Sequence, residues 1–356
     1  MKSFQITLTQ ESPVCFSNSR HKQNIFYTHD YIPGSVLWGF FINRYVKSKN
    51  CIHNDFFNDN VRFLNCFIKI ETNNHKRQSL PVPLSLFTCK INPYTYLVKE
   101  HRNEGHALLD LLFTDELQCQ RTGCLSELRP VQPGYFYSNG KGDIYRPRKI
   151  VEMHNRITKS NQNTMEDGLF SYELLDERGH EFAGHILVDK NSSLIEFIKK
   201  FNDKEIGLGK ARTSGCGYFT FNISDETNPG IDKFFENQFH DEINLYLHSD
   251  VIVMDSLNRY QTIISPVILG LENELHLEKS FTSSVEIQGF NAKHQKTRIN
   301  DTAVRKGSCF LYKLKTGADR SVIVKRMKEI EAQGLGIRKN EGFGRVKFNR
   351  KEFKED

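Results

Sequence analysis

Strongly apolar residues occupy every second position in residues 4–8 and again in residues 243–247. A period of two is typical of a β-strand with one buried face, so both stretches are predicted to be strands. The sequence around them also aligns, LTQESPV at 8–14 with LYLHSDV at 245–251. The pattern therefore predicts a chain of two halves that begin alike.

Three other stretches have apolar residues three or four positions apart, which is the spacing of an amphipathic helix. Pro33 suits the start of the first helix, and Asp319 can cap the third. The predicted helices are residues 31–46, 194–201 and 319–334. Further strands are predicted at residues 62–70, 218–223 and 345–348.

A glycine-rich stretch occurs twice, as GLGKARTSGCGYFTF at 207–221 and as GLGIRKNEGFGRVKF at 334–348. The two copies align without a gap, so they indicate an internal duplication. Glycines among basic residues can surround a phosphate with N–H groups and cations. The alternative is a turn whose basic residues are merely solvated. The predicted order of helix, glycines and strand excludes a dinucleotide-binding fingerprint, and no Gly-Lys-Ser/Thr follows as in a Walker loop.

Each half thus reads strand, helix, further strands, helix, glycine-rich loop, strand, which is the order of a βαββαβ unit. We expect an α+β fold with two ferredoxin-like (RRM-like) domains in tandem, at residues 1–228 and 240–356. The irregular residues from about 73 to 143 are expected to be an insertion. Residues 144–188 are expected to form a β-rich arm, with a hairpin turn at 177–179.

The start of the first predicted helix is rich in small residues, Gly34, Ser35 and Gly39. Such residues leave the helix N-terminus open to an anion or to a close backbone contact. They equally suit tight packing of the helix on a sheet. The sequence alone leaves both possibilities open.

The composition, 38% hydrophobic and 26% charged residues in a chain of 356, is that of a folded protein. Apolar runs stay well short of the 18 residues of a membrane span, and the N-terminus alternates, so we expect a cytoplasmic protein without a membrane partner. Basic residues exceed acidic ones by four in each of the ranges 141–160, 291–306 and 334–350. Such patches point to nucleic acid, or they are solvated surface.

Three cysteines, Cys89, Cys119 and Cys124, lie in the predicted insertion, with His101 and His106 between them. Thiolate and imidazole ligands can hold a structural zinc, which stabilises a region with little apolar content. The alternative is a set of unpaired thiols. No other cofactor is expected.

These features together resemble the RAMP superfamily of CRISPR-associated proteins: two ferredoxin-like halves, a glycine-rich loop before the last strand of each, and an IPGS helix start at 32–35. The run HNRITKSNQNTMEDGLF with GHEFAG resembles the Cas-five-group RAMP subunit of type III-D effector complexes. The resemblance implies a non-catalytic subunit that grips the repeat-derived 5′ handle of the CRISPR RNA. It also implies two kinds of protein partner, the large polymerase-like subunit and the repeated RAMP backbone subunits.

In that family the glycine-rich loops and the arm contact RNA. By position this role passes to Lys210, Arg212, Arg338, Lys339, Arg345, His154 and Arg156. The loop and arm patterns add further candidates, Arg146, Arg148, Lys159, Gly209, Thr213, Gly215, Gly336 and Gly342. The helix start adds Ser35 and Trp38; the latter replaces the arginine usual in the family, so it either stacks on a base or packs internally.

Two alternatives remain. A metal-independent RAMP endoribonuclease that processes precursor CRISPR RNA needs a general base, for which His154 or His29 could serve. Asp30 directly before Tyr31 is expected to be a turn or cap residue. A pure assembly protein would use its basic patches on acidic partner surfaces.

Overall fold

The structure is a computed structural model that describes residues 1–17, 24–72, 75–93, 106, 108–121, 123–136, 144–157, 164–227, 241–291 and 296–350. The fold is α+β, as predicted, and it is made mostly of strands. Its helices are α1 (Gly34–Lys49), α2 (Leu194–Lys199), α3 (Pro266–Leu269) and α4 (Arg320–Gln333). Within these ranges, no helix is both long and apolar enough to cross a membrane.

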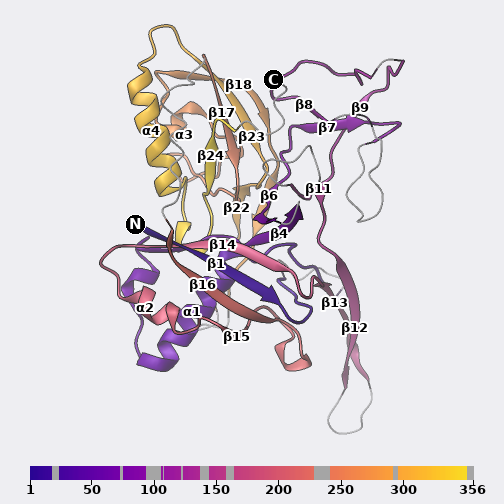
Figure 1. Cartoon of the computed structure of the whole chain (residues 1–356), viewed down its shortest axis with the longest axis vertical. Coiled ribbons are helices and arrows are strands. Elements are labelled where there is room, and N and C mark those ends of the chain that lie inside the picture. The colour runs from indigo at the N-terminus through magenta and orange to yellow at the C-terminus, as the bar shows by residue number, and fades with distance from the viewer. Residues whose placement is uncertain are drawn as a thin grey trace.

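A seven-stranded sheet forms the lower lobe in Figure 1. Its main path runs in the order β15-β16-β1-β14-β4-β5, and β3 also pairs with β14. The strands are β1 (Lys2–Gln10), β3 (Val61–Phe63), β4 (Phe67–Thr72), β5 (His75–Gln78), β14 (Glu181–Val188), β15 (Lys204–Gly207) and β16 (Tyr218–Thr227). Helices α1 and α2 lie in the same lobe.

A four-stranded sheet in the order β18-β23-β17-β24 forms the upper lobe, where α3 and α4 lie beside it (Figure 1). Its strands are β17 (Glu242–Leu247), β18 (Leu275–Phe281), β23 (Cys309–Leu314) and β24 (Val346–Phe348). Two short hairpins precede β23, namely β19 (Ser284–Ile287) with β22 (Asp301–Val304) and β20 (Phe290–Asn291) with β21 (Lys296–Thr297).

The remaining strands form small three-stranded sheets. One is the arm, in which β12 (Lys149–Ile157) pairs with β13 (Thr164–Leu175), and β13 with β2 (Ile25–Phe26). The arm projects away from the lower lobe (Figure 1). A second sheet consists of β6 (Leu80–Pro81), β10 (Tyr135–Phe136) and β11 (Ile144–Tyr145). A third consists of β7 (Leu86–Cys89), β8 (Leu109–Asp110) and β9 (Leu128–Pro130).

Several predicted elements are displaced. The first helix starts at Gly34 because Pro33 is extended and acts as its N-cap, and the helix ends at a left-handed Asn50. The first glycine-rich loop follows β15 rather than a helix. The expected hairpin at 177–179 is wrong, because its flanking strands β13 and β14 belong to different sheets. The hairpin of the arm is β12–β13 instead.

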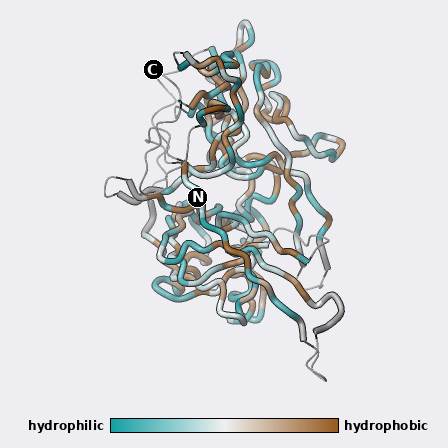
Figure 2. The backbone as a smooth tube through the Cα atoms, turned by 90° about the vertical axis from the view of Figure 1, so that its right-hand side faces the viewer, coloured by the Kyte–Doolittle hydropathy of each residue, from teal (hydrophilic) through white to brown (hydrophobic). Residues whose placement is uncertain are grey.

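Each lobe has its own hydrophobic core. In the lower lobe Leu37 and Phe41 of α1 pack with Phe63 and Phe221. In the upper lobe α4 contributes the buried Ile323, Met327 and Ile330, among others. Figure 2 shows hydrophobic stretches in both lobes, as expected for two separate cores.

The region around β6–β11 covers the second face of the upper sheet. Tyr246 and Leu311 point to this side and pack with Val82, Leu86 and Phe136, whereas their neighbours in β17 and β23 face the helices. A buried ion pair between Arg350 and Asp110, at 2.5 Å, joins the same two regions. Residues that the sequence places in the first half therefore complete the core of the second.

The two glycine-rich loops have the same backbone. Leu208 N donates to the Gly217 carbonyl and Leu335 N to that of Gly344, both at 2.8 Å. The hydroxyl of Ser12 accepts from Tyr218 N at 2.9 Å, and that of Ser249 accepts from Arg345 N at 2.8 Å. Each loop contains a short 3₁₀ turn, η2 (Arg212–Ser214) in the first and η4 (Lys339–Glu341) in the second. The predicted alignments of both the loops and the first strands are therefore seen in the hydrogen bonds.

The second loop joins the lobes. A Cβ on Gly342 would lie 2.7 Å from the Phe63 carbonyl oxygen, and one on Gly34 would lie 2.9 Å from the Glu341 carbonyl oxygen. The Asn65 side chain accepts from Gly34 N at 2.8 Å. Gly34 thus serves a close backbone contact, which was one of the possibilities left open, whereas a Cβ on Gly39 would meet nothing within 4 Å.

The matched glycines of the two loops give a stability prediction. Gly215 and Gly342 both have positive φ, at 83° and 94°, but a Cβ on Gly215 meets nothing within 4 Å. Gly215→Ala should cost only the left-handed penalty of about 1–2 kcal/mol. Gly342→Ala should cost a further ~1–3 kcal/mol of overpacking. Denaturant unfolding of the two variants measures the difference; equal losses would contradict the described contact.

Candidate nucleic-acid interface and metal site

The first glycine-rich loop is open to solvent. The side chains of Lys210, Arg212 and Thr213 are exposed, as is Gly215. The backbone keeps this shape because Gly209 has a φ of 77° and Lys210 N donates to the Cys15 carbonyl at 3.0 Å. The loop thus presents two cations on a backbone that is fixed by an isolated β-bridge between Lys210 and Cys15.

A groove of about 310 Å³ separates this loop from α1. One face of the helix lines the groove and includes Arg44 and Lys47. The loop lines the opposite side and includes Arg212. Among the described residues that line the groove there is no carboxylate. An uncompensated cluster of three cations is what an anion of the nucleic-acid backbone requires. Sequence reasoning missed Arg44 and Lys47, although they share a helical face with Gly39 and Phe40.

The base of the arm lies beside the same loop. Lys210 Nζ lies 4.5 Å from the centroid of the Phe26 ring, which packs on Phe170 and Tyr172 of β13. The ring of His154 stacks on that of Phe170 at 5.4 Å. The predicted arm and first-loop residues therefore belong to one region of the molecule.

Other predicted arm residues are placed individually. Arg146 is exposed and its side chain bonds to the Pro133 carbonyl at 3.1 Å and to Gln132, while Arg148 is exposed. Arg156 lies in β12, but the structure does not describe its side chain, and Lys159 lies outside the described residues.

The cations of the second loop are engaged inside the protein. Arg338 binds Asp301 and Glu341, each at 2.6 Å, and Lys339 lies 3.2 Å from Asp59. Burial acts to lower the pKa of Arg338, but the bonds to Glu341 and Asp301 raise it overall. Burial lowers the pKa of Arg345. These residues, with Gly336 and Gly342, form an internal junction rather than an open loop.

The helix-start candidates lie at this junction. Trp38 donates its indole N–H to the Phe56 carbonyl at 2.8 Å, and Asn340 of the second loop donates to the same carbonyl at 2.9 Å. The guanidinium of Arg298 lies 5.8 Å from the centroid of the Trp38 ring. Trp38 is thus half-buried and bonded to the Phe56 carbonyl, and the half-buried Ser35 lies in the first turn of the same helix.

A second cavity, of about 180 Å³, lies where the two lobes meet the arm. Lys149, Arg305 and Lys306 line it together with His29 and Asp30. Asp30 accepts from the Tyr135 hydroxyl at 2.6 Å and lies 3.8 Å from Lys306. Burial acts to raise the pKa of Asp30, but Lys306 and the Tyr135 hydroxyl lower it overall. Asp30 thus has structural bonds beyond the turn role expected of it.

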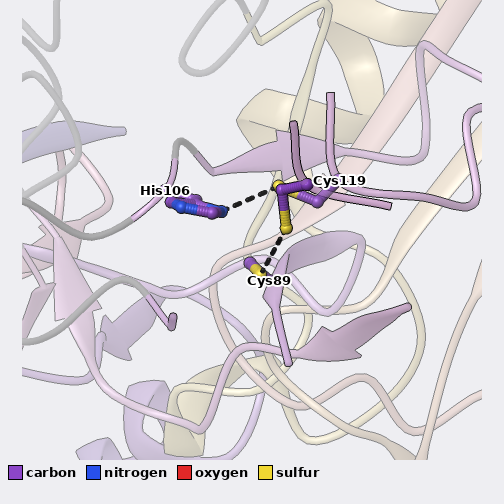
Figure 3. A group of neighbouring side chains, drawn as sticks. Cys89, His106 and Cys119 are labelled. Atoms are coloured by element: carbon purple, nitrogen blue, oxygen red, sulfur yellow. Dashed lines mark hydrogen bonds between the residues drawn. The ribbon is translucent and has the colours of Figure 1, made fainter. Parts of the chain in front are cut away.

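The cysteine cluster converges as predicted, and of the two histidines noted between its members His106 joins it. Ligand atoms of Cys89, His106, Cys119 and Cys124 all lie within 4.8 Å of one another. Figure 3 shows His106 Nδ1 directed at the sulfur of Cys119, at 3.0 Å. His101, the other histidine noted in the sequence, lies outside the described residues.

The donor set fits zinc. Three thiolates and one imidazole form a usual structural zinc set, and tetrahedral Zn–S bonds put sulfurs about 3.8 Å apart. The sulfurs of Cys89 and Cys124 are 3.8 Å apart. Burial acts to raise the pKa of Cys89, but hydrogen bonds from the Asn92 and Ile91 backbone groups lower it overall, whereas burial raises the pKa of Cys119. The cluster could therefore bind a structural metal such as zinc.

Comparison with known proteins identifies the family. Residues 7–220, more than half of the chain, match the model of the RAMP superfamily, so the chain belongs to that superfamily of CRISPR-associated proteins. No curated protein matches it significantly.

Solved structures give weaker similarities. A chain of the type III-B Cmr-beta bound to cognate target RNA and AMPPnP is 16% identical over 92% of this chain and 89% of its own, with a TM-score of 0.49. A second Cmr-beta structure with cognate target RNA gives 14% identity over the same shares and a TM-score of 0.47. A Cas6 product complex is 12% identical over 49% of this chain and 79% of its own, with a TM-score of 0.35. All three TM-scores lie below 0.5.

The metal site gives a second prediction. Protein purified without chelators should hold about one zinc per chain by elemental analysis, and Cys119→Ser should lose it because one of four ligands is removed. Cys51→Ser is the matched control, since Cys51 is exposed and outside the cluster. Equal zinc content in the two variants, or none in the wild type, would refute a zinc site.

Proposed function

We propose that this chain is a non-catalytic RNA-binding subunit of a type III CRISPR effector complex, resembling the Cas-five-group subunit of type III-D complexes. In this proposal it has two tandem ferredoxin-like domains, 1–228 and 240–356, is present once per complex and works in the cytoplasm. Its role is to hold the repeat-derived 5′ handle of the CRISPR RNA. It contacts the large polymerase-like subunit and the repeated RAMP backbone subunits.

Membership of the RAMP superfamily and the resemblance of the 154–170 run support this role. The tandem arrangement is supported by strand order, because β1 lies between β16 and β14 just as β17 lies between β24 and β23. The β6–β11 region, which packs on the upper sheet, corresponds to the proposed insertion.

The observation that carries the proposal is the carboxylate-free groove between α1 and the first loop. Arg44, Lys47 and Arg212 converge there from two elements, and the exposed Lys210 extends the cationic surface toward the arm. Cations that already pair with acids inside a protein add little to RNA binding, because binding would have to break those pairs. The first loop is therefore the proposed main RNA contact, with the arm residues beside it.

Mutation of the groove gives a third prediction. Arg44→Ala combined with Arg212→Ala should weaken single-stranded RNA binding across sequences. Each lost phosphate contact should also lower the slope of log K against log salt by about 0.7. Lys325→Ala, on the exposed side of α4, removes one cation outside the groove and is the control for each of the two groove substitutions made singly. Fluorescence anisotropy at several salt concentrations measures both quantities; unchanged affinity and slope in the double variant would contradict this contact.

The handle itself is tested in the assembled complex. The chain is purified with its neighbouring gene products, and the 5′ ends of the RNA that accompanies it are sequenced. A uniform repeat-derived 5′ end is the expected result. Random cellular RNA would mean that the basic surface binds RNA without specificity for the handle. Absence of RNA would refute the proposed role and favour a pure assembly protein.

The proposal also states that the chain does not cleave RNA. The ring of His154 is half-buried and stacked on Phe170, and its Nε2 lies 3.7 Å from Glu152, an arrangement that suits packing. As a fourth prediction, precursor CRISPR RNA incubated with the wild-type chain in EDTA should remain intact on a gel. Cleavage that His154→Ala or His29→Ala abolishes would establish the metal-independent endoribonuclease instead.

A further inference from the structure

We propose that the cavity at the base of the arm is a second RNA-contact site, which binds one ribose-phosphate unit and distinguishes RNA from DNA through His29. This inference rests on the proposed RNA-binding function and adds a separate site to it. The cavity is formed by residues distant in the sequence, namely Thr28–Asp30, the 81–84 and 133–135 segments, Lys149, Arg305 and Lys306.

The charge of the cavity favours an anion. Three cations line it, and Asp30 is the one carboxylate among its described lining residues. Asp30 is already bonded to Tyr135 and lies near Lys306, whose ammonium lies 4.1 Å from the centroid of the Tyr31 ring. Lys306 is largely buried, with 15% of its side chain exposed. Lys149 pairs with Glu173 at 2.8 Å and Lys306 lies near Asp30, so Arg305 leaves the cavity with a net positive charge that a phosphate would neutralise.

His29 supplies a different chemistry in the same cavity. Its ring packs on Tyr31 with centroids 5.0 Å apart. Burial and the charge of Lys306 lower its pKa to about 3, so the imidazole is neutral at physiological pH. A neutral imidazole has one donor and one acceptor nitrogen, which suits a hydroxyl group. The cavity thus offers cations that can bind a phosphate, and beside them a neutral imidazole that can bind a hydroxyl group. This combination matches a ribose with its 2′-OH and the adjacent phosphate.

The cavity also lies on a path from the first glycine-rich loop. Lys210 contacts Phe26. Two residues further along the chain, the Thr28 carbonyl oxygen accepts a hydrogen bond from the Lys149 ammonium at 2.9 Å. An extended chain advances about 3.3 Å per residue, so Phe26 and His29 lie at most about 10 Å apart. A nucleic-acid strand that leaves the groove along this segment would meet Lys210, Lys149 and then the cavity. This continuity favours a strand over a free anion.

Two variants test the site, each measured with a single-stranded RNA and a DNA of the same sequence. Arg305→Gln should weaken binding of both and lower the salt slope by about 0.7, because a phosphate contact is lost. Arg305→Lys should restore the slope. His29→Phe keeps the aromatic contact with Tyr31 but removes the hydrogen bond. It should weaken RNA binding about five- to tenfold, the size of one hydrogen bond, and leave DNA binding unchanged.

Thermal melting of each variant confirms that it is folded, and Lys325→Ala serves again as the control. An unchanged RNA-to-DNA ratio in His29→Phe, or an unchanged slope in Arg305→Gln, would overturn the inference. Inorganic phosphate, added alone in thermal melting, distinguishes a free phosphate from an RNA phosphate as the ligand. If it stabilises the wild type but not Arg305→Gln, while RNA binding is the same in both, the cavity binds free anions and the inference fails. Wild-type protein that binds no RNA at all would instead refute the proposed function.

Discussion

The backbone contact between the start of α1 and the second glycine-rich loop leaves no room for a side chain. Gly34 lies against the carbonyl of Glu341, and Gly342 lies against that of Phe63. Around this contact, Asn65 binds the first N–H of the helix and Arg62 donates to the Gln333 carbonyl at the end of α4. The placement of the two lobes, and so of everything between them, depends on these small residues.

The same contact accounts for the difference between two loops with one backbone. Both copies use equivalent hydrogen bonds and left-handed residues at matching positions, such as Ala211 and Arg338. In the second copy the 3₁₀ turn is covered by the other lobe, and carboxylates pair with its cations. In the first copy the turn faces a groove with Arg44 and Lys47 and stays exposed. A duplicated structural turn thus has one copy that joins the lobes and one that is available to a ligand.

The sequence predicted the repeated features well. Its two-residue period at β1 and β17, the Asp319 cap of α4 and the alignment of Ser12 with Ser249 all correspond to observed elements or bonds. It also brought Cys89, Cys119 and Cys124 together as possible ligands. These signals are local, or they occur twice, so a single chain is enough to detect them.

Long-range packing was not predictable in this way. Nothing local marks that β14 leaves the arm for the lower sheet, or that Tyr246 faces the β6–β11 region. In the sequence Arg338 and Arg212 are equivalent basic residues of the two loops. Only the fold shows that Asp301 and Glu341 neutralise the charge of Arg338. Likewise, His29 and Arg305 are 276 positions apart, and only the meeting of the lobes brings them into one cavity.

The central claim, that the first loop meets RNA while the second holds the lobes together, is tested most directly by photochemical cross-linking. RNA with photoreactive uridines is bound to the intact chain, and mass spectrometry identifies the attached peptides. Cross-links should concentrate in residues 36–47 and 207–217 and be absent from 334–345. Cross-links concentrated in 334–345, with none at the first loop, would contradict the account.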